Sequence, residues 1–221
     1  MPETVITVQG TFDAFHPAER ATVTVSIGFE GPEARPVVAQ TTQGTSALVA
    51  GIAERRDPER GPVTWYATDR IRVWANRPFH DKGVQNPLVH HAQTTTRAKF
   101  SDFKELARWV ERAAVHPGVR VDGIEWALTE KTKAATVADV RTRAVEDARR
   151  KATTYAEALG LADLRCVAVA DPGMLGDHSS GGGATPLAYS RAAAAEGAGG
   201  LSFTPEDIAV SAAVDARFVA S

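Results

Sequence analysis

A long alanine-rich helical segment constrains the fold of this chain more than any other feature of its sequence. From about Thr132 to Leu159 no proline or glycine interrupts the chain, and Gly160 follows at the position where glycine commonly ends a helix. The alanines between Ala144 and Ala152 would let such a helix lie close against a sheet. The expected inner face follows spacings of three, four or seven and comprises Ala134, Ala138, Val145, Ala148, Ala152, Tyr155 and Leu159.

Alternation of polar and apolar residues predicts strands on both sides of this helix. Arg20 to Phe29 is the clearest case, because its valines and Ile27 alternate with threonines and Ser26. Gly123 interrupts another alternating segment, which predicts a bulge or a close backbone approach. The other expected strands span residues 4–10, 63–76, 89–100, 119–129, 164–170 and 208–219.

Two shorter helices complete the pattern. Residues 33–56 form the first, and Asp102 with Glu105 supplies the capping box that begins the second. The order strand–helix–strand of residues 20–76 recurs at residues 89–129. We therefore expect an α+β fold, with a mixed, mainly antiparallel sheet, repeated βαβ units and the helices packed on one face. The expected inner face of the first helix comprises Val37, Val38, Thr41, Ala47, Leu48 and Ile52.

The domain prediction rests on a change of composition late in the chain. Residues 171–200 are dominated by glycine, alanine, serine and proline, which predicts a long mobile excursion. The chain of 221 residues is long enough for one large domain or two small ones. We predict a single domain over residues 1–221, with its core in residues 4–170 and 203–219.

Charge and hydropathy narrow the classes of partner. A formal net charge of −2 gives no overall attraction to nucleic acid, and no window has the roughly 18 apolar residues of a membrane span. The first residues alternate like a strand and do not resemble a signal peptide. Cys166 is expected to be an inert thiol in a buried strand. We expect a cytoplasmic protein that binds no nucleic acid and does not insert into a membrane.

Histidines near an expected hairpin are the metal candidates. His80 and Asp81 precede the strand that carries His90 and His91, and imidazole suits zinc or copper. Adjacent histidines on a strand point to opposite faces, so His90 and His91 cannot both ligate one ion without distortion. Polar histidines at a loop edge are the ordinary alternative.

Two other groups of residues have the residue types of a catalytic or phosphate-binding site but lack the neighbouring sequence that such a site needs. Asp177, His178, Ser179 and Ser180 are consecutive in a glycine-rich segment, whereas a catalytic triad needs rigid neighbours. The glycines of residues 181–183 precede no Lys-Ser or Lys-Thr pair, so we expect a flexible linker and no phosphate loop. We expect no catalytic residues, no cofactor and no enzymatic activity.

Three tryptophans on expected strands leave two possibilities open. Trp65, Trp74 and Trp126 could form an aromatic platform for a ligand or for single-stranded nucleic acid. Large aromatic side chains also dominate buried surface, which favours packing in a core or an interface. We expect packing.

A family resemblance follows from several stretches in order. Arg141-x-x-Ala144-Val145-x-Asp147-Ala148-Arg149-x-Lys151-Ala152, continuing to Leu159 and Gly160, resembles the signature helix of the SIMPL family, a domain of largely unknown function. The strand at residues 121–128 resembles the family's strand before this helix. The opening at residues 6–10 with Pro17, and the closing Phe203-Thr204-Pro205 with its strand from Ile208, resemble the family's two ends.

The resemblance implies a function class and no catalytic residues. It implies an α+β domain, assembly into large rings in some members, and links to oxidative-stress tolerance or signalling. Bacterial members are commonly periplasmic and carry a secretion signal that this chain does not show. Our leading hypothesis is a non-enzymatic module that acts through self-assembly or a partner protein. The alternative is a protein that binds a small molecule or a metal at the hairpin from His80 to His91.

Overall fold

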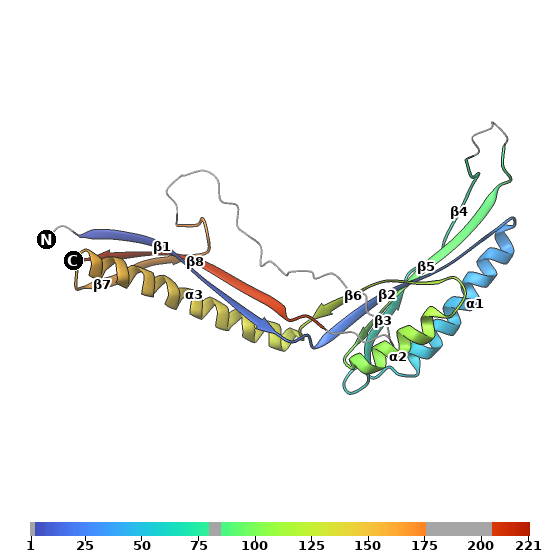
Figure 1. Cartoon of the computed structure of the whole chain (residues 1–221), viewed down its shortest axis with the longest axis horizontal. Coiled ribbons are helices and arrows are strands. Elements are labelled where there is room, and N and C mark those ends of the chain that lie inside the picture. Colours follow the sequence, from blue (N-terminus) through green and yellow to red (C-terminus); the bar gives the residue numbers. More distant parts are fainter. Residues whose placement is uncertain (1–2, 80–84, 176–204) are drawn as a thin grey trace. The chain divides into compact units, whose positions relative to one another are not determined.

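The computed structural model describes residues 3–79, 85–175 and 205–221 (Figure 1). These residues form two compact units. One contains residues 3–17, 128–175 and 206–221, and the other contains residues 18–79, 85–127 and 205. The α+β fold class is confirmed. The single domain over residues 1–221 stays a prediction, and the segment from 176 to 204 lies outside the described residues.

The first unit is one long helix on a three-stranded sheet. The sheet has the order β1-β8-β7, with β1 at Thr4–His16, β8 at Ile208–Ala220 and β7 at Leu164–Ala170. Both ladders are antiparallel, and Thr4 lies opposite Ala220, so the two ends of the described chain meet in one sheet. The helix α3 spans Glu130–Ala158 and packs on β1 and β8.

Small residues hold α3 against this sheet. A glycine on β1, Gly10, faces the helix, and a Cβ at this position would lie 2.6 Å from the Ala148 nitrogen. Backbone therefore packs on backbone at this point. A step of four residues advances about 40° around an α-helix, so a row with this spacing winds slowly about the axis. The buried residues of α3 form such a row, which comprises Thr136, Val140, Ala144, Ala148, Ala152 and Ala156.

The expected inner face of this helix is partly wrong. Ala148 and Ala152 are fully buried as predicted, but Tyr155 and Leu159 are 54% and 62% exposed. Ala134, Ala138 and Val145 are exposed as well. Ala134 and Ala138 each lie two positions from Thr136 of the buried row, so they face another side of the helix. The sheet also lies too close to α3 for the row to hold side chains as large as those of Tyr155 and Leu159.

The C-terminal end of α3 confirms the expected glycine. Gly160 has a φ of 73°, in the left-handed region, and its N–H donates to Glu157 O over 3.0 Å. The N–H of Leu161 donates to Ala156 O over 2.9 Å. This pair of bonds is the Schellman arrangement, which satisfies carbonyl groups that have no partner within the helix.

The second unit has two helices on a five-stranded sheet. Its strands are β2 (Arg20–Gly31), β3 (Val63–Thr68), β4 (Arg72–Asn76), β5 (Val89–Phe100) and β6 (Val119–Ala127). The order is β3-β5-β2-β6, and β4 also pairs with β5. The helices α1 (Ala34–Ala53) and α2 (Phe103–Ala114) both contribute to one core against β2 and β5.

The two strand–helix–strand repeats expected from the sequence supply all five strands of this sheet. Each of its ladders is antiparallel, and the one parallel pairing among the described residues is an isolated bridge from Arg56 to Val63. The strands β2 and β3 both flank β5, while β5 and β6 both flank β2. The two βαβ units are therefore interleaved, which is the split βαβ topology of ferredoxin-like folds.

Local details agree with the sequence in some places and not in others. The Asp102 carboxylate accepts from the Lys104 and Glu105 N–H groups, as expected of an N-cap. The bulge expected near Gly123 is present opposite Thr24 and Val25, although a Cβ at Gly123 would meet no atom within 4 Å. The strand expected over residues 63–76 is divided into β3 and β4.

The expected inner face of α1 is largely confirmed. Four of its six residues are buried, namely Val37, Thr41, Leu48 and Ile52, whereas Ala47 is exposed and Val38 is half-buried.

Candidate functional site: the uncovered face of the five-stranded sheet

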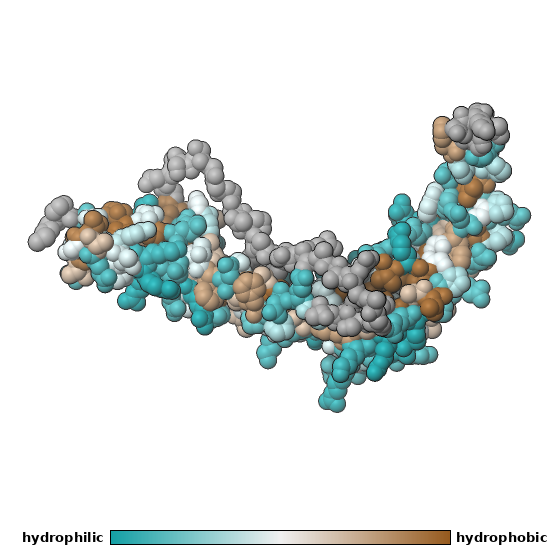
Figure 2. Space-filling model, in the orientation of Figure 1, coloured by the Kyte–Doolittle hydropathy of each residue, from teal (hydrophilic) through white to brown (hydrophobic). Residues whose placement is uncertain are grey.

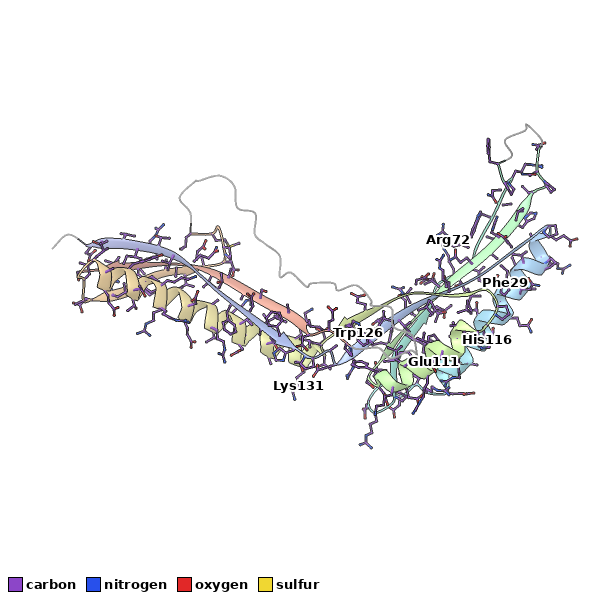
Figure 3. The ribbon with its side chains drawn as sticks, viewed as in Figure 1. Phe29, Arg72, Glu111, His116, Trp126 and Lys131 are labelled. Atoms are coloured by element: carbon purple, nitrogen blue, oxygen red, sulfur yellow. The ribbon has the colours of Figure 1, made fainter. Side chains whose placement is uncertain are left out.

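The face of the five-stranded sheet opposite the helices is the candidate functional surface. On β2, Val23 and Val25 point into the helix-side core, so Thr22 and Thr24 between them point to the other face. Within the part of the chain that the structure describes, no helix packs on that second face. In Figure 3, Arg72 of β4 lies on this side of the sheet, away from Glu111 of α2.

Two tryptophans lie on this uncovered face. Trp65 lies opposite Lys99 and is 42% exposed, and Trp74 lies opposite His91 and is 43% exposed. The third tryptophan on a strand, Trp126, packs edge-on against Phe103 at the core, with ring centroids 4.9 Å apart. The packing prediction is therefore confirmed for Trp126. Trp65 and Trp74 are not in the core, because the strand alternation turns them away from the helices, so for these two packing in an interface stays a prediction.

His91 holds Trp74 in place on the surface. The two rings stack with centroids 5.1 Å apart and planes 6° from parallel. The His91 Nδ1 lies 3.3 Å from Glu30 Oε2, and its Nε2 lies 2.6 Å from Asn76 Oδ1. Both ring nitrogens of His91 thus have polar neighbours, which fixes the imidazole and, through stacking, the indole.

The charges of this face are largely paired with one another. Arg97 lies 3.2 Å from Asp69, and Arg120 lies 2.7 Å from Asp122. The Ser26 hydroxyl also donates to Asp122 over 3.2 Å. Such exposed pairs contribute little stability each, about 0–1 kcal/mol. Figure 2 shows hydrophobic residues among hydrophilic ones along the hairpin of β4 and β5.

The metal candidates are not brought together on the described chain. His90 and His91 alternate along β5 and point to opposite faces, in agreement with strand geometry. His80 and Asp81 lie outside the described residues. Residues 3–79, 85–175 and 205–221 contain no group of three or more His, Cys, Asp or Glu side chains placed to hold a metal ion. The segment Asp177 to Ser180 and the glycines at 181–183 also lie outside the described residues.

The expectation of a buried thiol at Cys166 is wrong. Cys166 is exposed, because β7 is an edge strand and its register with β8 shifts between Cys166 and Ala168. The Sγ atom lies 3.7 Å from Ala168 O, which is a weak contact.

A second polar cluster, on the first unit, was not apparent from the sequence. The Asp147 carboxylate accepts from the Thr11 N–H over 3.0 Å, and the Lys151 ammonium donates to Gln9 O over 2.9 Å. The two side chains are themselves 2.8 Å apart. The hydrogen bond from Lys151 and then that from the Thr11 N–H hold the pKa of Asp147 below its ordinary value of 3.8. The contact of this pair with β1 joins residues too far apart in the sequence to be predicted from spacing.

These observations define an antiparallel α+β protein with two sheets, each of which carries its helices on one face. The chain belongs to the SIMPL family, described as a protein of unknown function (DUF541), whose model matches residues 6–218. The resemblance found in the signature helix is thereby confirmed over nearly the whole chain. None of the curated proteins matches the chain. None of the described helices combines the length and the apolar character needed to cross a membrane.

Proposed function

We propose that this SIMPL-family protein is a non-enzymatic module that acts through protein–protein contacts, with self-association as the first form to test. The observation that carries the proposal is the pair of half-exposed tryptophans, Trp65 and Trp74, on a sheet face that no described helix covers. Tryptophan and arginine are enriched where protein interfaces bind most strongly, and this face carries both.

The corresponding face of the three-stranded sheet is a weaker candidate. On β1 its exposed large apolar residues are Val5 and Phe15, which lie at opposite ends of the strand. Over β8 the chain itself occupies the face, because the Gly173 N–H donates to Asp215 Oδ2 over 2.7 Å and Arg217 donates to Leu175 O. A partner would have less free surface on this sheet.

The geometry gives the metal-binding alternative less support than the interface. Ligation by His91 would displace Glu30 or Asn76 from its ring nitrogens. We also propose a cytoplasmic location, since an exposed free cysteine suits a compartment that keeps thiols reduced. A role in stress tolerance is what the family resemblance implies, and survival of a deletion strain under peroxide tests it.

Sedimentation velocity over a hundredfold range of protein concentration tests the interaction module. We expect the wild-type chain to associate as concentration rises, and the double variant Trp65→Ala/Trp74→Ala to stay monomeric. Tyr155→Ala is the matched control, because Tyr155 is an exposed aromatic residue on α3 of the other unit. A wild-type monomer at every concentration would contradict self-association. Equal loss in the control would contradict the assignment to this face.

A further inference from the structure

The unpaired edge strands of the two sheets differ in how they are protected against pairing with another strand. The inference drawn from this difference rests on the proposed function and specifies the kind of partner. A free strand edge exposes main-chain N–H and C=O groups that pair readily with another strand. On β1, Asp147 and Lys151 of α3 bind the outward main-chain groups of Thr11 and Gln9. On β7, the register shift at Val167 makes a bulge that breaks the regular edge.

The edges of the five-stranded sheet formed by β6 and β3 are protected too. A bulge interrupts β6 beside Asp122, and charged side chains flank it. A register shift interrupts β3 between Val63 and Trp65. The main chain of Val63 is also bonded, since its carbonyl accepts from Asp57 over 3.0 Å and its N–H donates to Arg55 over 3.4 Å.

The edge of β4 has no such device among the described residues. Its five residues pair with β5 in an unbroken register, from Arg72 opposite Gln93 to Asn76 opposite Val89. Every residue of β4 is exposed, including Val73 and Trp74. A regular, exposed edge strand is the kind to which an extended peptide adds.

The direction of the main-chain groups on β4 follows from one hydrogen bond. Thr95 O accepts from the Asp69 N–H, so the odd-numbered residues of β5 turn their main-chain groups toward β4. Arg72 and Trp74, which lie opposite Gln93 and His91, then bond to β5. The N–H and C=O of Val73 and Ala75 therefore face outward, where a further strand would pair.

The charge beside this edge decides which kind of strand fits. Arg70, Arg72 and Arg77 are all exposed on β4 or next to it. The nearby carboxylates of Asp69 and Glu30 already have partners, in Arg97 and His91. A second copy paired edge to edge would bring two sets of three arginines together, which like-charge repulsion disfavours.

We propose that β4 binds an extended acidic segment of a partner protein as an added antiparallel strand. In this arrangement an acidic residue lies opposite Arg72 and an apolar residue lies opposite Trp74, two positions apart. Main-chain bonds to Val73 and Ala75 provide the affinity, and the two side chains provide the selection.

The test uses the full chain and a fluorescently labelled peptide, Glu-Thr-Val-Tyr-Val-Glu-Thr-Glu. In an antiparallel alignment its tyrosine lies opposite Trp74, and its three glutamates lie opposite Arg77, Arg72 and Arg70. Fluorescence anisotropy measures binding, and a peptide with lysine at each glutamate position is the control. We expect the acidic peptide to bind at least tenfold more tightly than the lysine peptide, with the difference reduced by salt.

Two variants of the chain separate the edge from general charge. Val73→Pro removes an outward N–H without removing a bond to β5, and Arg72→Glu reverses the selecting charge. Each should weaken binding by about tenfold or more. Arg35→Glu, an equal charge change at an exposed position of α1, should leave binding unchanged. Circular dichroism confirms that each variant is folded.

The outcomes are distinct. Failure of the acidic peptide to bind, equal binding of the lysine peptide, or indifference to both variants overturns the proposal. A wild-type dimer that Val73→Pro dissociates, with no peptide binding, assigns the edge to a second copy and also overturns it. If the acidic peptide does not bind, while the chain self-associates in a way that depends on Trp65 of β3 and not on Val73, the proposed function stands and this inference fails.

Discussion

The two units of this chain pack helices on a sheet with side chains of opposite size. In the first, α3 lies on β1 and β8 through a row of alanines, and Gly10 removes even a methyl group from the contact. In the second, α1 and α2 are held away from the sheet by large side chains, among them Phe100, Leu106 and Trp109. The first core is sensitive to added volume, and the second is sensitive to removed volume.

The largest expected change in the free energy of unfolding comes from a substitution in the core of the second unit. Phe100 is fully buried and tilts against Trp109 with ring centroids 5.8 Å apart. Phe100→Ala should lower the free energy of unfolding by about 4 kcal/mol, because it leaves a cavity among residues that cannot collapse into it. Chemical denaturation measures the loss, and a loss below about 1 kcal/mol would show that this core is loosely packed.

The next largest expected loss of stability tests the close contact between β1 and α3 in the first unit. Gly10→Ala should cost about 3 kcal/mol, since the new methyl group overlaps the backbone of α3 at Ala148 and the Ala144 carbonyl. Gly51→Ala on α1 is the matched control, because its Cβ meets nothing within 4 Å. The control should gain about 0.5–1 kcal/mol from helix propensity. Similar effects at both positions would contradict the account of β1 and α3.

A smaller effect separates the observed inner face of α3 from the one expected from spacing. Ala148→Leu should cost about 2 kcal/mol, because Ala148 is fully buried against the sheet. Ala138→Leu, at an exposed position, should change stability by less than about 0.5 kcal/mol. Thermal unfolding of the two variants compares them directly. A larger loss of stability in Ala138→Leu than in Ala148→Leu would contradict the observed inner face and support the one expected from the sequence.

The smallest effect concerns the polar contact between α3 and β1. Asp147→Asn should cost about 1 kcal/mol, because it weakens the bonds to Thr11 and Lys151 at a partly exposed site. The pKa of Asp147 is lowered in the folded chain, so its contribution is present above about pH 4 and is lost as the pH falls through the folded pKa. Denaturation at several pH values should show a shallower acid loss in Asp147→Asn than in the wild type. Parallel curves would contradict this.

Much of the fold was predictable because it depends on local pattern. The bounds of β7 agree with the sequence, and Gly160 and Asp102 end and begin helices as expected. These features are fixed by residues near in sequence, through alternation and capping.

The rest depends on contacts that span the chain. The pairing of β1 with β8 and the bonds from α3 to Gln9 and Thr11 join residues more than a hundred positions apart. The division of one expected strand into β3 and β4 decides where Trp65 and Trp74 lie, yet no glycine or proline lies between Thr68 and Arg72. For the candidate site, the residue types were visible in the sequence, and the face on which they gather was not.

Hydrogen–deuterium exchange at high and low protein concentration tests the central claim most directly. If the uncovered face of the five-stranded sheet is the interaction surface, peptides from residues 63–76 should exchange more slowly in the associated state. Peptides from α1, α2 and α3 should exchange at unchanged rates. Protection that appears on the helices and not on β3 and β4 would contradict the account.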